Sequence, residues 1–83
     1  MSQYQQITRA SDDGLIVYTL TPIDGSVHVE RSQRFVKARY RLCMKFEEEN
    51  TFVQWCRADS VRFVYPLLSA DIERQGRALF AAR

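Results

Sequence analysis

The sequence predicts an α+β fold: an antiparallel β-meander sheet of about four to six strands, packed by one C-terminal α-helix. The segment Val36–Phe46 alternates between apolar and mostly charged residues. Turn residues divide the first half of the chain into short runs, and the C-terminal segment carries a helical apolar stripe. A chain of 83 residues fits a single domain, residues 1–83.

The composition is that of a folded domain, with 46% hydrophobic, 12% aromatic and 27% charged residues. Folding of so short a chain buries only roughly 60–65% of its unfolded surface, so a homodimer is weighed equally with a monomer. No apolar run approaches the roughly 20 residues of a membrane span, and the first residues lack the features of a signal peptide. We therefore expect a cytoplasmic protein without membrane contact, whose two cysteines stay reduced.

The first half of the chain contains candidate strands separated by turn residues. Asp12–Gly14 marks one turn and Pro22–Gly25 another, since Pro presets φ and Gly supplies positive φ. Leu15–Leu20 lies between them and is a β-branched and aromatic run of strand length. Val27–Glu30 alternates and is expected to pair back on that run, and Tyr4–Arg9 is a weaker edge strand.

The clearest strand is Val36–Phe46. All its even positions are apolar, and its odd positions are charged except for Cys43. A helical stripe through the same segment would include charged residues such as Arg39 and Lys45, so the period of two is favoured. The strand therefore has one apolar face and one basic face.

Two further strands are expected after this one. A loop at Glu47–Asn50 would return the chain as a strand over residues 51–56, with Trp55 on the apolar face and Phe52 on the basic face. Another strand, Val61–Tyr65, would extend the meander until Pro66 ends it, because proline cannot donate to the ladder.

The C-terminal segment predicts a helix that covers the apolar face of the sheet. Ser69 is a candidate N-cap, followed by acidic residues that the helix dipole favours. Ile72, Gly76, Leu79 and Phe80 form its apolar stripe. Because glycine costs about 1 kcal/mol relative to alanine inside a helix, we expect Gly76 to permit a close approach to the sheet.

The chain shows no motif for catalysis, a metal or a cofactor. Cys43 and Cys56 would lie diagonally on one face of a hairpin, and we interpret them as reduced thiols, with a disulfide as the minor alternative and no spacing for zinc. Glu47–Glu49 would share one solvated turn and so lack the contrasting environments of catalytic carboxylates. A small enzyme using these cysteines or His28 is the least supported alternative.

The basic face of the Val36–Phe46 strand is the candidate binding surface. Six of the 12 basic residues lie between Arg31 and Lys45, and no acidic residue lies between Arg31 and Phe46. Arg62 would lie near this face on the third strand, Val61–Tyr65, and Phe52 would supply an aromatic side chain. The expected partner-binding residues are Lys37, Arg39, Arg41, Lys45, Phe52 and Arg62.

Three interpretations of this face remain open. Basic side chains with an aromatic neighbour could follow a phosphate backbone and stack a base, could bind an acidic patch on a protein, or could simply be solvated. Because the adjacent glutamates would repel phosphate, the sequence favours a protein partner over nucleic acid. The favoured function is a small non-enzymatic protein-binding module, a regulator, adaptor or inhibitor of the kind that phages and other mobile elements carry.

Overall fold

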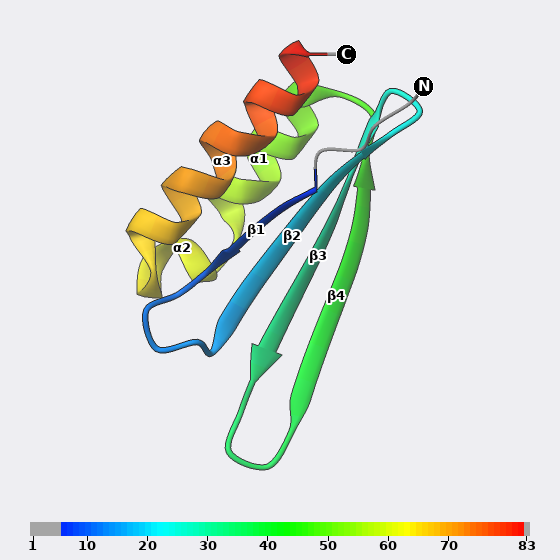
Figure 1. Ribbon diagram of the computed structural model, residues 1–83. Helices are drawn as coiled ribbons and strands as arrows, with labels where there is room; N and C mark the ends of the chain where they lie inside the picture. Colours follow the sequence, from blue (N-terminus) through cyan, green and yellow to red (C-terminus); the bar gives the residue numbers. More distant parts are fainter. Residues whose placement is uncertain (1–5, 83) are drawn as a thin grey trace.

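The computed structural model describes residues 6–82, which form two layers, a four-stranded sheet and a layer of three helices (Figure 1). The strands are β1 (Ile7–Ala10), β2 (Ile16–Ile23), β3 (Ser26–Arg34) and β4 (Arg39–Phe46). The helices are α1 (Glu49–Ala58), α2 (Val61–Val64) and α3 (Pro66–Ala81). All neighbouring strands are antiparallel and their order in space follows the chain. The predicted α+β meander with a C-terminal helix is confirmed.

Tight turns join the longer strands. Asp24 and Gly25 connect β2 to β3 with φ values of 51° and 79°, the left-handed backbone that a two-residue hairpin requires. The β3–β4 turn is closed by the N–H of Phe35, which donates to the carbonyl of Ala38 at 2.7 Å. The β3–β4 hairpin projects beyond the helices at the bottom of Figure 1, and the molecule is accordingly elongated, 41 × 24 × 19 Å.

The strand boundaries in the first half differ slightly from the predicted ones. β2 and β3 extend the expected strands by several residues, because they pair continuously from Ile16–Gln33 to Ile23–Ser26. β4 starts at Arg39 rather than Val36, because residues 35–38 form the hairpin turn. The expected Tyr4–Arg9 strand corresponds to β1 in part, and its first two residues lie outside the described part of the chain.

The core lies between the inner face of the sheet and the helices. Alternate residues of β2 and β3, Ile16, Tyr18, Leu20, Val27 and Val29, are buried there. Aromatic rings join the layers, since Phe52 of α1 contacts Phe46 of β4 at 5.5 Å and Phe80 of α3 at 5.9 Å between ring centroids. This packing makes the helical layer, and not a further strand, the cover of the apolar sheet face.

The prediction of two strands after β4, over residues 51–56 and Val61–Tyr65, is wrong. Phe52 and Cys56 are separated by one helical turn, so they share a face of α1 and both are buried. A short apolar run fits either period, and here tertiary packing selects the helix.

The start of the C-terminal helix also differs from the prediction. α3 begins at Pro66, where the missing N–H of proline removes no helical hydrogen bond, and Ser69 lies buried inside the helix rather than at its cap.

Gly76 permits the close packing of two helices. A Cβ atom at Gly76 would overlap the ring of Phe52, which is completely buried. The sequence predicts a close approach at this glycine, but the surface that approaches is α1 rather than the sheet. The difference follows from the helical conformation of the residues around Phe52.

Candidate protein-binding surface

Exposed hydrophobic side chains gather at one end of the molecule. Among residues 6–82, the large exposed ones come from three places: the start of β2, the β3–β4 hairpin and the α2–α3 junction. They are Leu15, Phe35, Val36, Tyr40, Phe63, Val64 and Leu67, and we call this set the apolar end. Leu15, Phe35 and Val64 line one shared depression of about 220 Å³, so the three places are connected.

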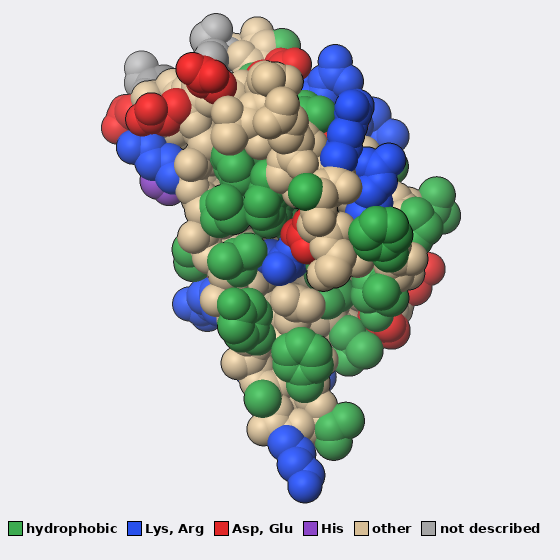
Figure 2. Space-filling view, turned by 180° about the vertical axis from the view of Figure 1, so that it is seen from behind, with side chains coloured by type: hydrophobic (Ala, Val, Ile, Leu, Met, Phe, Trp, Pro, Cys, Tyr) green, Lys and Arg blue, Asp and Glu red, His purple; other side chains and the backbone are tan. Residues whose placement is uncertain are grey.

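The apolar end results from the lengths of the elements. The β3–β4 hairpin extends past the helices, so its inner face there has no described helix above it (Figure 1). Figure 2, the view from behind, shows hydrophobic side chains gathered across the middle of the molecule and down to its narrow end, where a basic side chain forms the tip. Phe63 and Leu67 are 82% and 86% exposed, which is far more than a core residue tolerates.

Hydrogen bonds hold the β1–β2 turn against the helices beside the apolar end. The hydroxyl of Tyr65 donates to Oδ2 of Asp13 at 2.6 Å, and the hydroxyl of Ser11 donates to Oδ1 of Asp13 at 2.6 Å. These hydrogen bonds lower the pKa of the Asp13 carboxyl and raise the pKa of Tyr65. They fix Leu15 and Val64, the immediate neighbours of this cluster, in place.

The second candidate surface is the outer face of the sheet, which no described helix covers (Figure 1). The β3–β4 register places Arg34 beside Arg39 and Ser32 beside Arg41 on this face. Arg41 Nε lies 3.0 Å from Oε1 of Glu30. Lys45, on the same face, has its Nζ 3.7 Å from a carboxylate oxygen of Glu47. The basic side chains therefore share the outer face, and acidic neighbours compensate part of their positive charge.

The structure does not bring all six predicted binding residues together. Arg39, Arg41 and Lys45 share the outer face of β4, and Lys37 lies in the hairpin turn. Phe52 is completely buried in α1, so its expected place on the basic face is wrong. The described strands put no Phe, Tyr or Trp side chain on the outer face, which lowers its suitability for stacking nucleic-acid bases.

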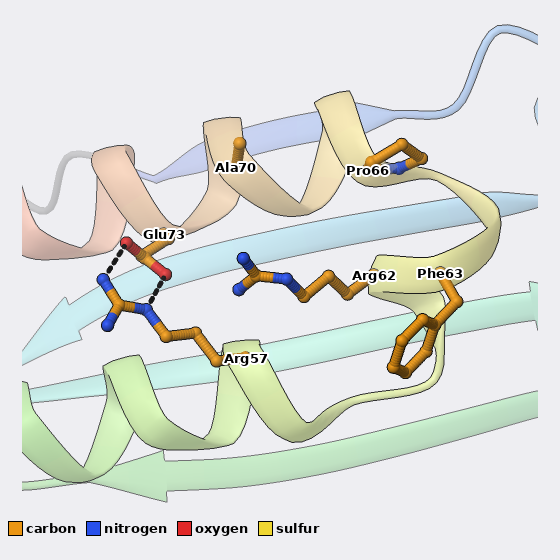
Figure 3. Close-up of a pocket in the computed structure, with 6 residues that line it drawn as sticks. All are labelled: Arg57, Arg62, Phe63, Pro66, Ala70 and Glu73. Carbon is orange, nitrogen blue, oxygen red and sulfur yellow. Dashed lines mark hydrogen bonds and ion pairs between the residues drawn. The ribbon is translucent and has the colours of Figure 1, made fainter.

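Arg62 lies in the helical layer and not on the sheet. It points into a depression of about 350 Å³ between the helices, toward the ion pair of Arg57 with Glu73 (Figure 3). Arg57 Nε and Nη2 donate to the two carboxylate oxygens of Glu73 at 3.1 and 3.2 Å. This pairing lowers the pKa of Glu73 and raises that of Arg57. Because Glu73 neutralises Arg57, the positive charge that the depression presents to a ligand comes from Arg62.

The two cysteines occupy different environments. Cys56 is buried in the core, and burial raises the pKa of its thiol to about 12. Cys43 is exposed on the outer face of β4. The predicted diagonal placement of the two on one hairpin face is wrong, because Cys56 belongs to α1. His28 is also on the outer face, opposite Lys45, and so lies across the sheet from Cys56.

Neither a metal centre nor a membrane helix is found in the described part of the chain. Within residues 6–82, no group of His, Cys, Asp and Glu side chains could hold a metal ion. In the same range, no helix is long and apolar enough to cross a membrane.

The fold and its surfaces define a small α+β domain with two uncovered surfaces, the apolar end and the basic outer face of the sheet. No protein-family model, curated protein or solved structure matches the chain. Function is therefore inferred from the chemistry of these surfaces.

Sequence reasoning missed the apolar end. One signal could have revealed part of it, since Phe35-Val36 stands in a hairpin turn where polar turn residues are usual. The contributions of Leu15 and Leu67 could be found only from the folded arrangement.

Proposed function

We propose that the protein is a small non-enzymatic module that binds another protein through the apolar end. One observation carries this proposal: the large exposed hydrophobic side chains of residues 6–82 come from three segments, and one depression, lined by Leu15, Phe35 and Val64, joins the three segments. Contiguous exposed apolar patches on folded domains are typical of interaction sites. Phe35, Tyr40 and Phe63 supply aromatic side chains of the kind that dominate the binding energy of protein interfaces.

The charges around the apolar end specify the chemistry of the partner. Lys37 directly follows Val36 in the turn, and Arg39 directly precedes Tyr40 in β4. A partner with apolar anchors surrounded by acidic side chains would complement this surface, and its association would be accelerated by electrostatic attraction. The proposed role is that of a regulator, adaptor or inhibitor in the cytoplasm, in which the basic residues steer and the apolar residues anchor.

Site-specific photo-crosslinking in cells of the native host tests this proposal. A photoreactive phenylalanine analogue in place of Val36, which is fully exposed, should capture a partner protein. The matched control carries the same analogue at Ala81, an exposed residue near the other end of α3. Capture at Val36 that disappears in a Phe35→Asp background supports the proposal.

Two outcomes contradict the proposal. If Val36 and Ala81 capture the same proteins with the same yield, the contact is non-specific. If the folded Val36 variant captures nothing but a second copy of this chain, the apolar end serves self-association and binds no other protein.

The row of basic residues on the outer face keeps nucleic acid as a second candidate partner. Arg34, Arg39 and Arg41 lie together on adjacent strands of an open sheet face. Affinity for generic DNA and RNA should then fall steeply with salt and be lost in the triple variant Lys37→Ala, Arg39→Ala, Arg41→Ala. Absence of binding at low salt would rule out this candidate.

A further inference from the structure

β4 is an edge strand with one free side. Among residues 6–82 it pairs with β3 alone, and Figure 1 shows it along the border of the sheet with no described element beyond it. Edge strands carry unpaired backbone N–H and C=O groups that can bind an added strand. The opposite edge, β1, is only four residues long, whereas β4 has eight. β4 is therefore the longer template for strand addition.

The phase of the ladder shows which backbone groups of β4 face the free side. Opposite residues in an antiparallel pair alternate between sharing two hydrogen bonds and sharing none. The hydrogen bond from Phe35 to Ala38 marks one bonded pair. Every second residue of β4 after Ala38 is therefore also in a bonded pair, so the backbone groups of Tyr40, Leu42 and Met44 point toward β3. The backbone groups of the residues between them point to the free edge, namely Arg39, Arg41, Cys43 and Lys45.

The side chains of this edge are sorted by chemistry. Arg39, Arg41 and Lys45 are exposed on the outer face, whereas Leu42 and Met44 are half-buried on the inner face. Directly opposite residues of two paired strands lie on the same face of a sheet. A strand laid along β4 would therefore complement it best by alternating acidic residues toward the outer face with apolar residues toward the inner face.

We propose that the partner contributes an extended segment of alternating acidic and apolar residues, which adds to the sheet along β4. This inference rests on the proposed function, because it specifies how the protein bound at the apolar end is held. The added strand would form main-chain hydrogen bonds with the edge residues, and its acids would lie beside Arg39 and Arg41. Its apolar residues would extend the surface of Tyr40, which belongs both to β4 and to the apolar end.

A second copy of β4 is a poor occupant of this edge. In antiparallel pairing centred on Cys43, Arg41 would lie opposite Lys45 of the copy. Pairing centred on Leu42 would place Arg39 opposite Lys45 of the copy, and pairing centred on Arg41 would place two copies of Arg41 together. Like charges directly opposite each other destabilise a sheet. The same basic row therefore opposes self-pairing and favours an acidic strand.

Binding of synthetic peptides tests the inference. The test peptide has eight residues, the length of β4, and alternates Glu and Val. One control has the same residues in two blocks, and another alternates Lys and Val. We expect the alternating acidic peptide to shift the NMR amide signals of residues 39–45, and each control to bind at least about tenfold more weakly, because several cross-strand charge pairs are lost.

Two variants separate strand addition from simple charge attraction. Cys43→Pro removes one N–H that faces the free edge without removing a bond to β3, so peptide affinity should fall roughly threefold or more, whereas Cys43→Ala keeps it. If the proline variant does not fold, the double variant Arg39→Glu, Arg41→Glu still decides, because it should bind the alternating Lys–Val peptide more tightly than a block isomer of the same residues, which simple charge attraction does not predict.

Three results would overturn the inference: no binding of the alternating acidic peptide, equal binding of its block isomer, or amide shifts outside β4 and its neighbours. If one of these occurs while the Val36 crosslinker still captures a partner, strand addition fails and the proposed function stands. If both experiments are negative, both proposals fail.

Discussion

Arg31 and Asp59 form an ion pair inside the molecule, between β3 and the short link from α1 to α2. Their side chains are only 9% and 8% exposed. The guanidinium of Arg31 also lies 5.7 Å from the centroid of the Trp55 ring, and Oδ1 of Asp59 accepts a hydrogen bond from the N–H of Val61 at 3.3 Å. The pair therefore connects β3 to the start of α2, the helix that carries Phe63 and Val64.

Removal of one charge from this pair should destabilise the fold strongly. Asp59→Asn keeps a side-chain oxygen for the Val61 N–H but leaves the Arg31 charge buried and uncompensated. We expect the free energy of unfolding in urea to fall by about 3 kcal/mol. The double variant Arg31→Met, Asp59→Asn should regain most of the loss. A double variant as unstable as the single one would show that the charge pairing is not the cause.

Gly76→Ala should also destabilise the protein, although alanine is the better helix former. The added methyl group would overlap the Phe52 ring, and overpacking of this kind costs about 1–3 kcal/mol. Thermal unfolding of the variant should show a lowered Tm. The control is Phe52→Leu combined with Gly76→Ala, in which the smaller side chain leaves room for the methyl group. If the two substitutions together destabilise the protein by the sum of their separate effects or more, the contact between residue 76 and the Phe52 ring is not tight.

Glu73 should contribute to stability at neutral pH and lose that contribution in acid. The pKa of Glu73 is lowered by its ion pair with Arg57, below the ordinary value of 4.5. A lowered folded-state pKa means that the contribution is complete above the ordinary pKa and disappears as pH falls through the folded-state value. At pH values below about 4.5, the urea concentration at the unfolding midpoint of the wild type should therefore decrease. The decrease should be smaller in Glu73→Gln. Identical acid profiles for the two proteins would contradict the role of this pair.

The two thiols should differ sharply in reactivity. Cys43 is exposed, whereas Cys56 is buried and its pKa is raised to about 12, so little thiolate forms at neutral pH. A thiol-specific reagent should modify one cysteine quickly in the native protein and the second only at the rate of unfolding. The variant Cys43→Ser should remove the fast phase. A fast phase that persists in this variant would show that Cys56 is accessible.

An element of this fold is predictable from sequence when many residues carry its periodic signal. The alternation through Leu42, Met44 and Phe46 is long, and charges occupy the other face, so the orientation of β4 follows from period alone. Residues 51–56 offered too short an apolar run to distinguish a strand from a helix, and the packing of Phe52 against Gly76 decides the matter. Such a contact between distant residues has no periodic signature.

The candidate site was predictable to a smaller extent. Arg39, Arg41 and Lys45 were placed on one face correctly because they belong to one strand. The placement of Phe52 and Arg62 failed with the secondary structure of their segments. The apolar end could not be predicted as a whole, since it combines three distant segments whose exposure depends on where the helices stop covering the sheet.

The strand order of the sheet has a consequence for synthesis of the protein. Each strand pairs with the one made immediately before it, so hairpins can form in succession as the chain leaves the ribosome. Of the described elements, α3 is made after all the others, although its Ile72 and Phe80 complete the cover of the sheet. Until α3 emerges, α1 alone can cover the apolar side of the nascent sheet, near Phe46, and the rest of that side stays exposed. That interval is when this protein is most exposed to aggregation and to capture by chaperones.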